Sequence, residues 1–161
     1  MKKITLFLTT LFVAFSAMAQ TVIFKETFGD VGTKENRPYV DQYSGWDNPN
    51  CTFTGQNVSI RMTSTLSTHA WFPKGKTSFI NIAGVTGGKN LSIGFDFAAN
   101  KGGLTTDELS LTVNGVKVNI PSTVASKQNE YVTVAPVAIA DADVLEIRIS
   151  DASGMTTEGV R

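Results

Sequence analysis

Residues 108–120 read ELSLTVNGVKVNI, and this stretch decides the fold class. Apolar and polar residues alternate on either side of Asn114-Gly115, the dipeptide that two-residue type I′ hairpin turns favour. A turn at this point places six apolar side chains on one face of the hairpin. They pair as Val113 with Val116, Leu111 with Val118 and Leu109 with Ile120. The sequence therefore predicts a β-hairpin with one face against a core and the other in water.

The same period of two recurs along the chain in short runs, separated by clusters of Gly, Asn, Asp, Ser and Pro. The predicted strands are an opening strand at 21–24, an aromatic strand at 68–73, a long central strand at 91–97, and others at 58–62, 79–82 and 144–150. In the last of these, Glu146 and Arg148 face water as a pair. We therefore expect an all-β, jelly-roll-like antiparallel β-sandwich of about eight strands.

Residues 131–139 leave two arrangements open. Either Val132 and Val134 face the core, or Tyr131, Thr133 and Ala135 do. Because Pro136 cannot donate a backbone hydrogen bond, the segment is expected at a sheet edge or at a bulge.

The two ends of the chain carry separate expectations. Residues 1–19 read as a cleaved signal peptide, with Lys2 and Lys3 before an apolar core and small residues before Gln20. This predicts an exported protein, periplasmic, surface-associated or secreted, with one domain at 20–161. At the other end Val160-Arg161 begins a further run, so the fold either ends in a short edge strand or lacks a final strand.

Charge and cysteine content limit the partners. Without the signal peptide the chain has 12 basic and 14 acidic side chains, and its Lys and Arg residues are not clustered. Nucleic acids and anionic membranes are recognised through such clusters, so neither is expected as a partner. No later apolar run is long enough to insert in a membrane. The lone Cys51 cannot form an internal disulfide, and we expect it to be buried and inert rather than paired between chains.

Four stretches carry a resemblance to a known kind of module. They are FKETFG at 24–29, YSGWDN at 43–48, LSIGFDFAANKG at 91–102 and DVLEIRISDASG at 143–154. In these the chain resembles exported β-sandwich modules of polysaccharide-foraging gut bacteria, related to galactose-binding-like and carbohydrate-binding jelly rolls. The resemblance implies an accessory module that binds glycans or packs on a neighbouring domain, and it implies no catalytic activity.

Residues 29–50 are rich in turn formers and are predicted to form a long surface loop, where function usually resides on a sandwich. Aromatic rings stack on sugars, and nearby carboxylates and amides bind their hydroxyl groups. The candidate ligand-binding residues are Tyr39, Asp41, Tyr43, Trp46, Asp47 and Asn48 in this loop, with Trp71 from the aromatic strand. The alternative is that Trp46 and Trp71 fill the core, as large aromatic residues commonly do.

Calcium is the cofactor that the residues favour, because oxygen atoms of loop acids suffice to bind it. The candidate ligands are Glu26 and Asp30 after the opening strand and Asp151 after the last full strand. Sandwiches of the kind that this chain resembles often hold a structural ion near the chain ends. The alternative is that these acids are simply solvated.

Catalytic chemistry is not expected. His69 is the single histidine, no Gly-x-Ser-x-Gly motif is present, and one His with one Cys cannot build a zinc site. We expect a non-catalytic exported binding module with carbohydrate as its ligand. The alternative is a structural or interaction protein that docks a partner protein at the cell surface, through a sheet edge or through the long loop.

Overall fold

The computed structural model describes residues 22–63, 67–85, 91–100, 104, 108–121, 130–139, 143–151, 155 and 157–161. The predicted signal peptide at 1–19 lies outside them. The described residues form ten strands and a single 3₁₀ turn, η1 (Val40–Gln42). The prediction of an all-β, antiparallel sandwich is confirmed. The strands number ten instead of about eight, because two of them span only two residues each.

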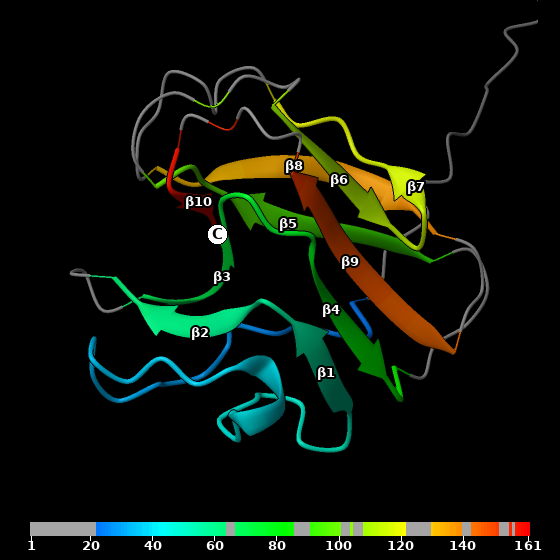
Figure 1. Ribbon diagram of the computed structural model, residues 1–161. Helices are drawn as coiled ribbons and strands as arrows, with labels where there is room; N and C mark the ends of the chain where they lie inside the picture. The colour runs from blue at the N-terminus through cyan, green and yellow to red at the C-terminus, as the bar shows by residue number, and fades with distance from the viewer. Residues whose placement is uncertain are drawn as a thin grey trace, which may run out of the picture.

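Five strands form the first layer, in the order β1-β4-β9-β6-β7 (Figure 1). Their bounds are β1 (Thr52–Gln56), β4 (Ser78–Ala83), β9 (Val144–Asp151), β6 (Leu109–Val113) and β7 (Val116–Lys117). Every neighbouring pair is antiparallel. On the central strand β9 the expected ion pair forms, with Arg148 Nη2 2.7 Å from Glu146 Oε2.

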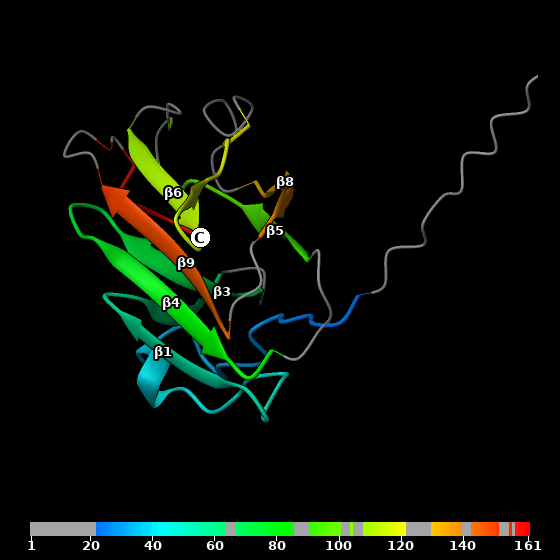
Figure 2. The ribbon, with the colours of Figure 1, turned by 90° about the vertical axis from the view of Figure 1, so that its right-hand side faces the viewer.

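The second layer contains two groups of strands. β2 (Ser59–Met62), β3 (Thr68–Pro73) and β10 (Gly159–Val160) pair in the order β10-β3-β2, while β5 (Ser92–Phe97) pairs with β8 (Val132–Ala138). The last residues of the chain link the groups, because Arg161 and Ala98 exchange backbone hydrogen bonds of 2.7 and 3.0 Å. Figure 2 shows the sandwich from its side, with β1, β4, β9 and β6 facing β5 and β8.

The core lies between the layers and includes apolar residues of both. Its members are Ile80, Ile82, Leu111 and Ile149 of the first layer and Ile60, Phe72, Phe97 and Val134 of the second, among others. The long loop is attached to this core through η1. Val40 is buried, Val40 N donates to Val58 O at 3.2 Å, and Ile60 N donates to Pro38 O at 2.8 Å. The loop is therefore fixed along the outer side of β2.

The predicted hairpin forms as expected, with one exception. Asn114 and Gly115 both have positive φ, 47° and 79°, as a type I′ turn requires, and Val113 pairs with Val116. Five of the six predicted core residues are buried: Leu109, Leu111, Val113, Val118 and Ile120. Val116 is instead 44% exposed, and it lies on β7, the outermost strand of its layer.

Two predicted strands differ in the structure. Residues 22–24 were expected to open the sandwich as a strand, but they have no regular secondary structure. The strand at 91–97 was expected to be central, yet among the described strands β5 pairs only with β8. Its predicted sidedness holds, since Ile93, Phe95 and Phe97 are the more buried residues. The alternation of apolar and polar residues determines which side chains face the core. It does not determine which strands pair with this one, because those strands are distant in the sequence.

The alternatives that the sequence left open at 131–139 are resolved. Val134 is buried and Thr133 and Ala135 are exposed, so Val132 and Val134 face the core. The register between β5 and β8 shifts between Ile93 and Phe95, which is the predicted bulge, and it lies opposite Ala135 and Pro136. At the end of the chain a short strand forms, but it lies inside the layer: Val160 pairs with Phe72 and bridges to Ala99.

Candidate functional site

Asp47, Asn48 and Glu26 fasten the segment that follows Phe24 to the loop at 43–48. Asp47 Oδ2 accepts hydrogen bonds from the backbone and the hydroxyl of Thr27. Asn48 Nδ2 donates to Lys25 O at 2.6 Å and to Glu26 Oε2 at 3.0 Å. Glu26 Oε1 accepts from Phe28 N at 2.8 Å and from Asp47 N at 3.1 Å. These side chains replace the strand pairing that residues 22–30 lack.

The aromatic residues of the loop pack on the core. The Trp46 ring stacks flat on Phe53 of β1, with centroids 3.8 Å apart and planes 4° apart, and Tyr43 meets its edge at 4.9 Å. Trp46 Nε1 donates to Tyr43 O at 2.8 Å, and the Tyr43 hydroxyl donates to Phe28 O. Burial, with the nearby charges of Glu26, Asp30 and Asp47, raises the pKa of Tyr43. Both rings therefore hold the loop in place, and for Trp46 this packing is the alternative to ligand contact.

The remaining candidates lie apart from that network. Trp71 is 7% exposed, the Arg61 guanidinium lies 4.7 Å from its ring centroid, and Gly159 lies in close contact with the indole. A sugar ring therefore cannot reach its face. Tyr39 is 56% exposed and bridges to Ser59, and Asp41 is exposed in η1. The structure thus brings Tyr43, Trp46, Asp47 and Asn48 together and leaves Tyr39, Asp41 and Trp71 elsewhere.

Of the three acids proposed as calcium ligands, Glu26 and Asp30 lie in the segment beside the loop, and the side chain of Asp151 lies outside the described part of the structure. Glu26 belongs to the loop network, and Asp30 Oδ1 accepts from Gly32 N at 2.7 Å. Asp151 ends β9, and Val144, seven residues earlier, begins it. Val144 pairs with Ala83, and the residue after Ala83, Gly84, lies near Asn48. At about 3.3 Å per residue this is roughly 23 Å along the strand. Among the described residues no group of three or more His, Cys, Asp or Glu side chains is arranged to hold a metal ion.

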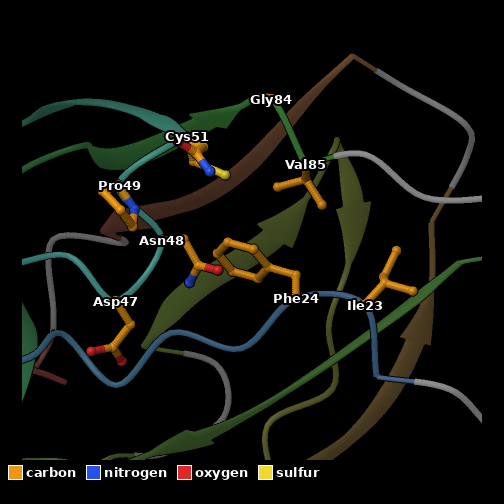
Figure 3. A pocket seen from close by; sticks show the side chains of 9 residues that line it. Ile23, Phe24, Asp47, Asn48, Pro49, Cys51, Gly84 and Val85 are labelled. Atoms are coloured by element: carbon orange, nitrogen blue, oxygen red, sulfur yellow. The ribbon is translucent and has the colours of Figure 1, made fainter.

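A small pocket lies where the loop network meets the ends of β1 and β4. Its volume is about 250 Å³, and Ile23, Phe24, Asp47, Asn48, Pro49, Asn50, Cys51, Gly84 and Val85 line it. Figure 3 shows the amide of Asn48 beside the ring of Phe24, with Cys51 and Val85 around them. The recorded hydrogen bonds of Asp47 and Asn48 use Oδ2 and Nδ2, so Oδ1 of each has no partner among the described residues.

Sequence reasoning found part of this pocket and missed the rest. Asp47 and Asn48 were predicted as ligand-binding residues, whereas Phe24, Gly84 and Val85 were not. Phe24 was assigned to a strand, and nothing local in the sequence places the end of β4 beside the loop. Cys51 is half-buried at the pocket wall. The sequence had predicted it to be buried.

A much larger cavity of about 1140 Å³ lies between the two layers. Its walls are mostly apolar and include Ile80, Leu145 and Ile147 of the first layer and Phe95 and Phe97 of the second. His69, Tyr131 and Arg161 are polar residues of its wall. His69 is 5% exposed, and burial, with a smaller effect of Arg161 and Arg61, lowers its pKa to about 4. It is therefore neutral at physiological pH.

No protein-family model, curated protein or solved structure matches this chain. The resemblance to galactose-binding-like modules consequently stays an expectation. No helix among the described residues has the length and apolar character needed to cross a bilayer.

Proposed function

We propose that this chain is an exported, non-catalytic binding module, and that the pocket at Phe24 and Asn48 binds a single sugar unit of a glycan. The observation that carries the proposal is the combination of an aromatic ring with two unused side-chain acceptors, Oδ1 of Asp47 and of Asn48, in one small pocket. Sugar hydroxyl groups donate to such acceptors, while the C–H face of the sugar packs on a ring.

The size and position of the pocket support a terminal or side-branch sugar. About 250 Å³ lies below the usual range for drug-sized ligands, so a single unit fits and a longer chain would extend into water. The pocket rests on the ends of β1 and β4 and on a loop tied down by at least six hydrogen bonds. Its acceptors are therefore held in position before the ligand arrives, which lowers the entropic cost of binding.

The test is a glycan array on residues 20–161, followed by calorimetric titration of any glycan that binds. Phe24→Leu keeps the apolar volume but removes the ring, and we expect it to weaken binding at least about tenfold. Tyr39→Ala, exposed and outside the pocket, is the matched control and should bind as tightly as the parent. Equal affinity for Phe24→Leu and the parent, or an empty array with folded protein, would contradict the proposal.

The proposal includes a calcium ion that Glu26 and Asp30 bind and that stabilises the loop. Adding a chelator to the same titration should weaken glycan binding if an ion holds the loop. Unchanged affinity would leave the hydrogen-bond network as the sole support of the pocket and would remove calcium from the proposal.

A second function is favoured by a different observation. Docking of a partner protein through a sheet edge is supported because, among the described strands, β5 pairs with β8 alone and β10 pairs with β3 only at Phe72 and Pro73.

A further inference from the structure

Two arginine side chains lie next to each other on the outer face of the second layer. Tyr39, in the long loop, forms an antiparallel bridge with Ser59 of β2, and the backbone hydrogen bonds on both sides of this bridge are formed. Continued by two residues, this register places Arg37 opposite Arg61. Ile60, between Ser59 and Arg61, belongs to the core, so the two arginines lie on the face that is turned away from it.

Each guanidinium group is held by the protein through its Nε atom. Arg61 Nε donates to Ser59 Oγ at 2.9 Å, and the guanidinium lies 4.7 Å from the ring centroid of Trp71. Arg37 Nε donates to Lys34 O at 3.2 Å. The Nη atoms of both arginines make no hydrogen bond or ion pair with any residue that the structure describes. These Nη atoms therefore remain as donors for a ligand, on side chains that are already oriented.

The two positive charges repel each other. Burial, followed by the charge of Arg37, lowers the pKa of Arg61, against a smaller opposite effect of Tyr39. Like charges directly opposite each other on neighbouring strands destabilise a sheet. An oxyanion bound between the two guanidinium groups would remove this repulsion, because its oxygen atoms accept hydrogen bonds from both.

The surroundings favour a ligand with one isolated negative group. Glu35 and Asp41 are exposed in the same loop and repel further negative charge, which disfavours a polyanion such as a nucleic acid. A peptide strand is disfavoured because both edges of β2 are occupied at Ser59, by Trp71 of β3 on one side and by Tyr39 on the other. The arginines therefore suit a charged substituent on an otherwise neutral chain.

We propose that Arg37 and Arg61, which we call the arginine pair, bind one carboxylate or sulfate group of an acidic glycan. The neutral sugar units on either side of this group keep other charges away from Glu35 and Asp41. The choice of a glycan as ligand rests on the function proposed above. The site itself is a different one, because neither arginine lines the pocket at Phe24.

The first experiment compares a tetrasaccharide that carries one uronic acid with its methyl ester, by calorimetric titration of residues 20–161. We expect the acid to bind at least about tenfold more tightly, because esterification removes the charge and keeps the sugar chain. A tetrasaccharide with one sulfate ester, compared with its desulfated form, tests the second source of the oxyanion. The NMR signals of the Nε–H groups of Arg37 and Arg61 should shift when the acidic glycan binds.

Three variants locate the site on the protein. Arg37→Gln removes one charge at an exposed position, and we expect it to weaken binding of the acidic tetrasaccharide at least about tenfold. Arg37→Lys keeps the charge without the planar donor group and should recover only part of the affinity. Lys117→Gln, the matched control, removes the same net charge from an exposed position on β7 in the other layer and should leave the affinity unchanged.

Four results would overturn the proposal. They are no binding of either acidic tetrasaccharide, equal affinity for the acid and its ester, equal weakening by Arg37→Gln and Lys117→Gln, and tighter binding of a short acidic peptide at the same arginines. The last of these would assign the arginine pair to a partner protein.

A further variant separates this proposal from the function proposed for the pocket. Phe24→Leu should leave the preference for acid over ester unchanged, and Arg37→Gln should leave the binding of a neutral glycan at Phe24 unchanged. Failure at one site is therefore distinguishable from failure at the other.

Discussion

At the scale of single residues, His69 couples the stability of the fold to pH. Its imidazole is buried in β3, and burial lowers its folded-state pKa to about 4, against an ordinary value of 6.5. The unfolded chain therefore binds a proton near pH 6.5 while the folded chain does not until about pH 4. Stability from this group is complete above pH 6.5 and is lost on acidification through that window, by up to about 3 kcal/mol.

This prediction is checked by urea unfolding of the parent and of His69→Gln at pH 7.5 and pH 4.5. We expect the parent to lose more unfolding free energy between the two pH values than the variant, since glutamine does not titrate. Carboxylates such as Asp47 titrate in both proteins, so their effect cancels in the comparison. Equal losses in parent and variant would show that His69 is accessible to protons in the folded state.

The aromatic residues of the loop show what residue type alone cannot decide. A tryptophan in a turn-rich segment can stack on a ligand or pack into the core, and the sequence left both alternatives open for Trp46. The deciding partner is Phe53, seven residues away on the next strand, whose ring lies parallel to the indole. The contact with Phe53 decides whether the Trp46 ring is free to bind a ligand or packs on the core. This contact depends on how the loop leads into β1.

At the scale of elements, the hairpin of β6 and β7 depends on the conformation of Gly115. Its φ is 79° and no atom lies within 4 Å of where a Cβ would be, so a substitution meets backbone strain without a clash. We expect Gly115→Ala to lower the unfolding free energy by about 1 kcal/mol, measured by urea titration. Gly94→Ala in β5, where φ is not positive and the nearest atom is 3.7 Å from the Cβ position, should change it by less than about 0.5 kcal/mol.

The hairpin was predictable because its turn, its register and its apolar face are all encoded within 13 residues. The same reasoning failed for residues 22–24, whose alternating pattern matches a strand but which have no paired neighbour in the structure. The residues that follow them, Lys25 and Thr27, are held by Asn48 and Asp47, which lie 20 or more residues away in the sequence. Alternating patterns identify segments that are able to form strands. Whether such a segment does form a strand depends on a pairing partner that is distant in the sequence.

At the scale of the whole molecule, the candidate sites arise where separate parts of the chain meet. The sugar pocket joins Ile23 and Phe24, the loop at 47–51 and the end of β4, and the large cavity lies between strands of both layers. The sequence predicted some members of the pocket because acids and amides in a loop are recognisable there. It could only suggest an open sheet edge, because the position of that edge follows from the order of the strands.

The bulge at Ala135 and Pro136 has a consequence for the solubility of the protein. β8 ends its layer among the described strands, and a straight strand in that position would offer its outer edge to neighbouring molecules in concentrated solution. We expect Pro136→Val to lower the concentration at which the native protein forms fibrillar aggregates, measured by thioflavin fluorescence and turbidity. Thr133→Val adds the same side chain to the same strand and should leave that concentration unchanged. A proline that interrupts pairing with β5 thus also keeps separate molecules apart.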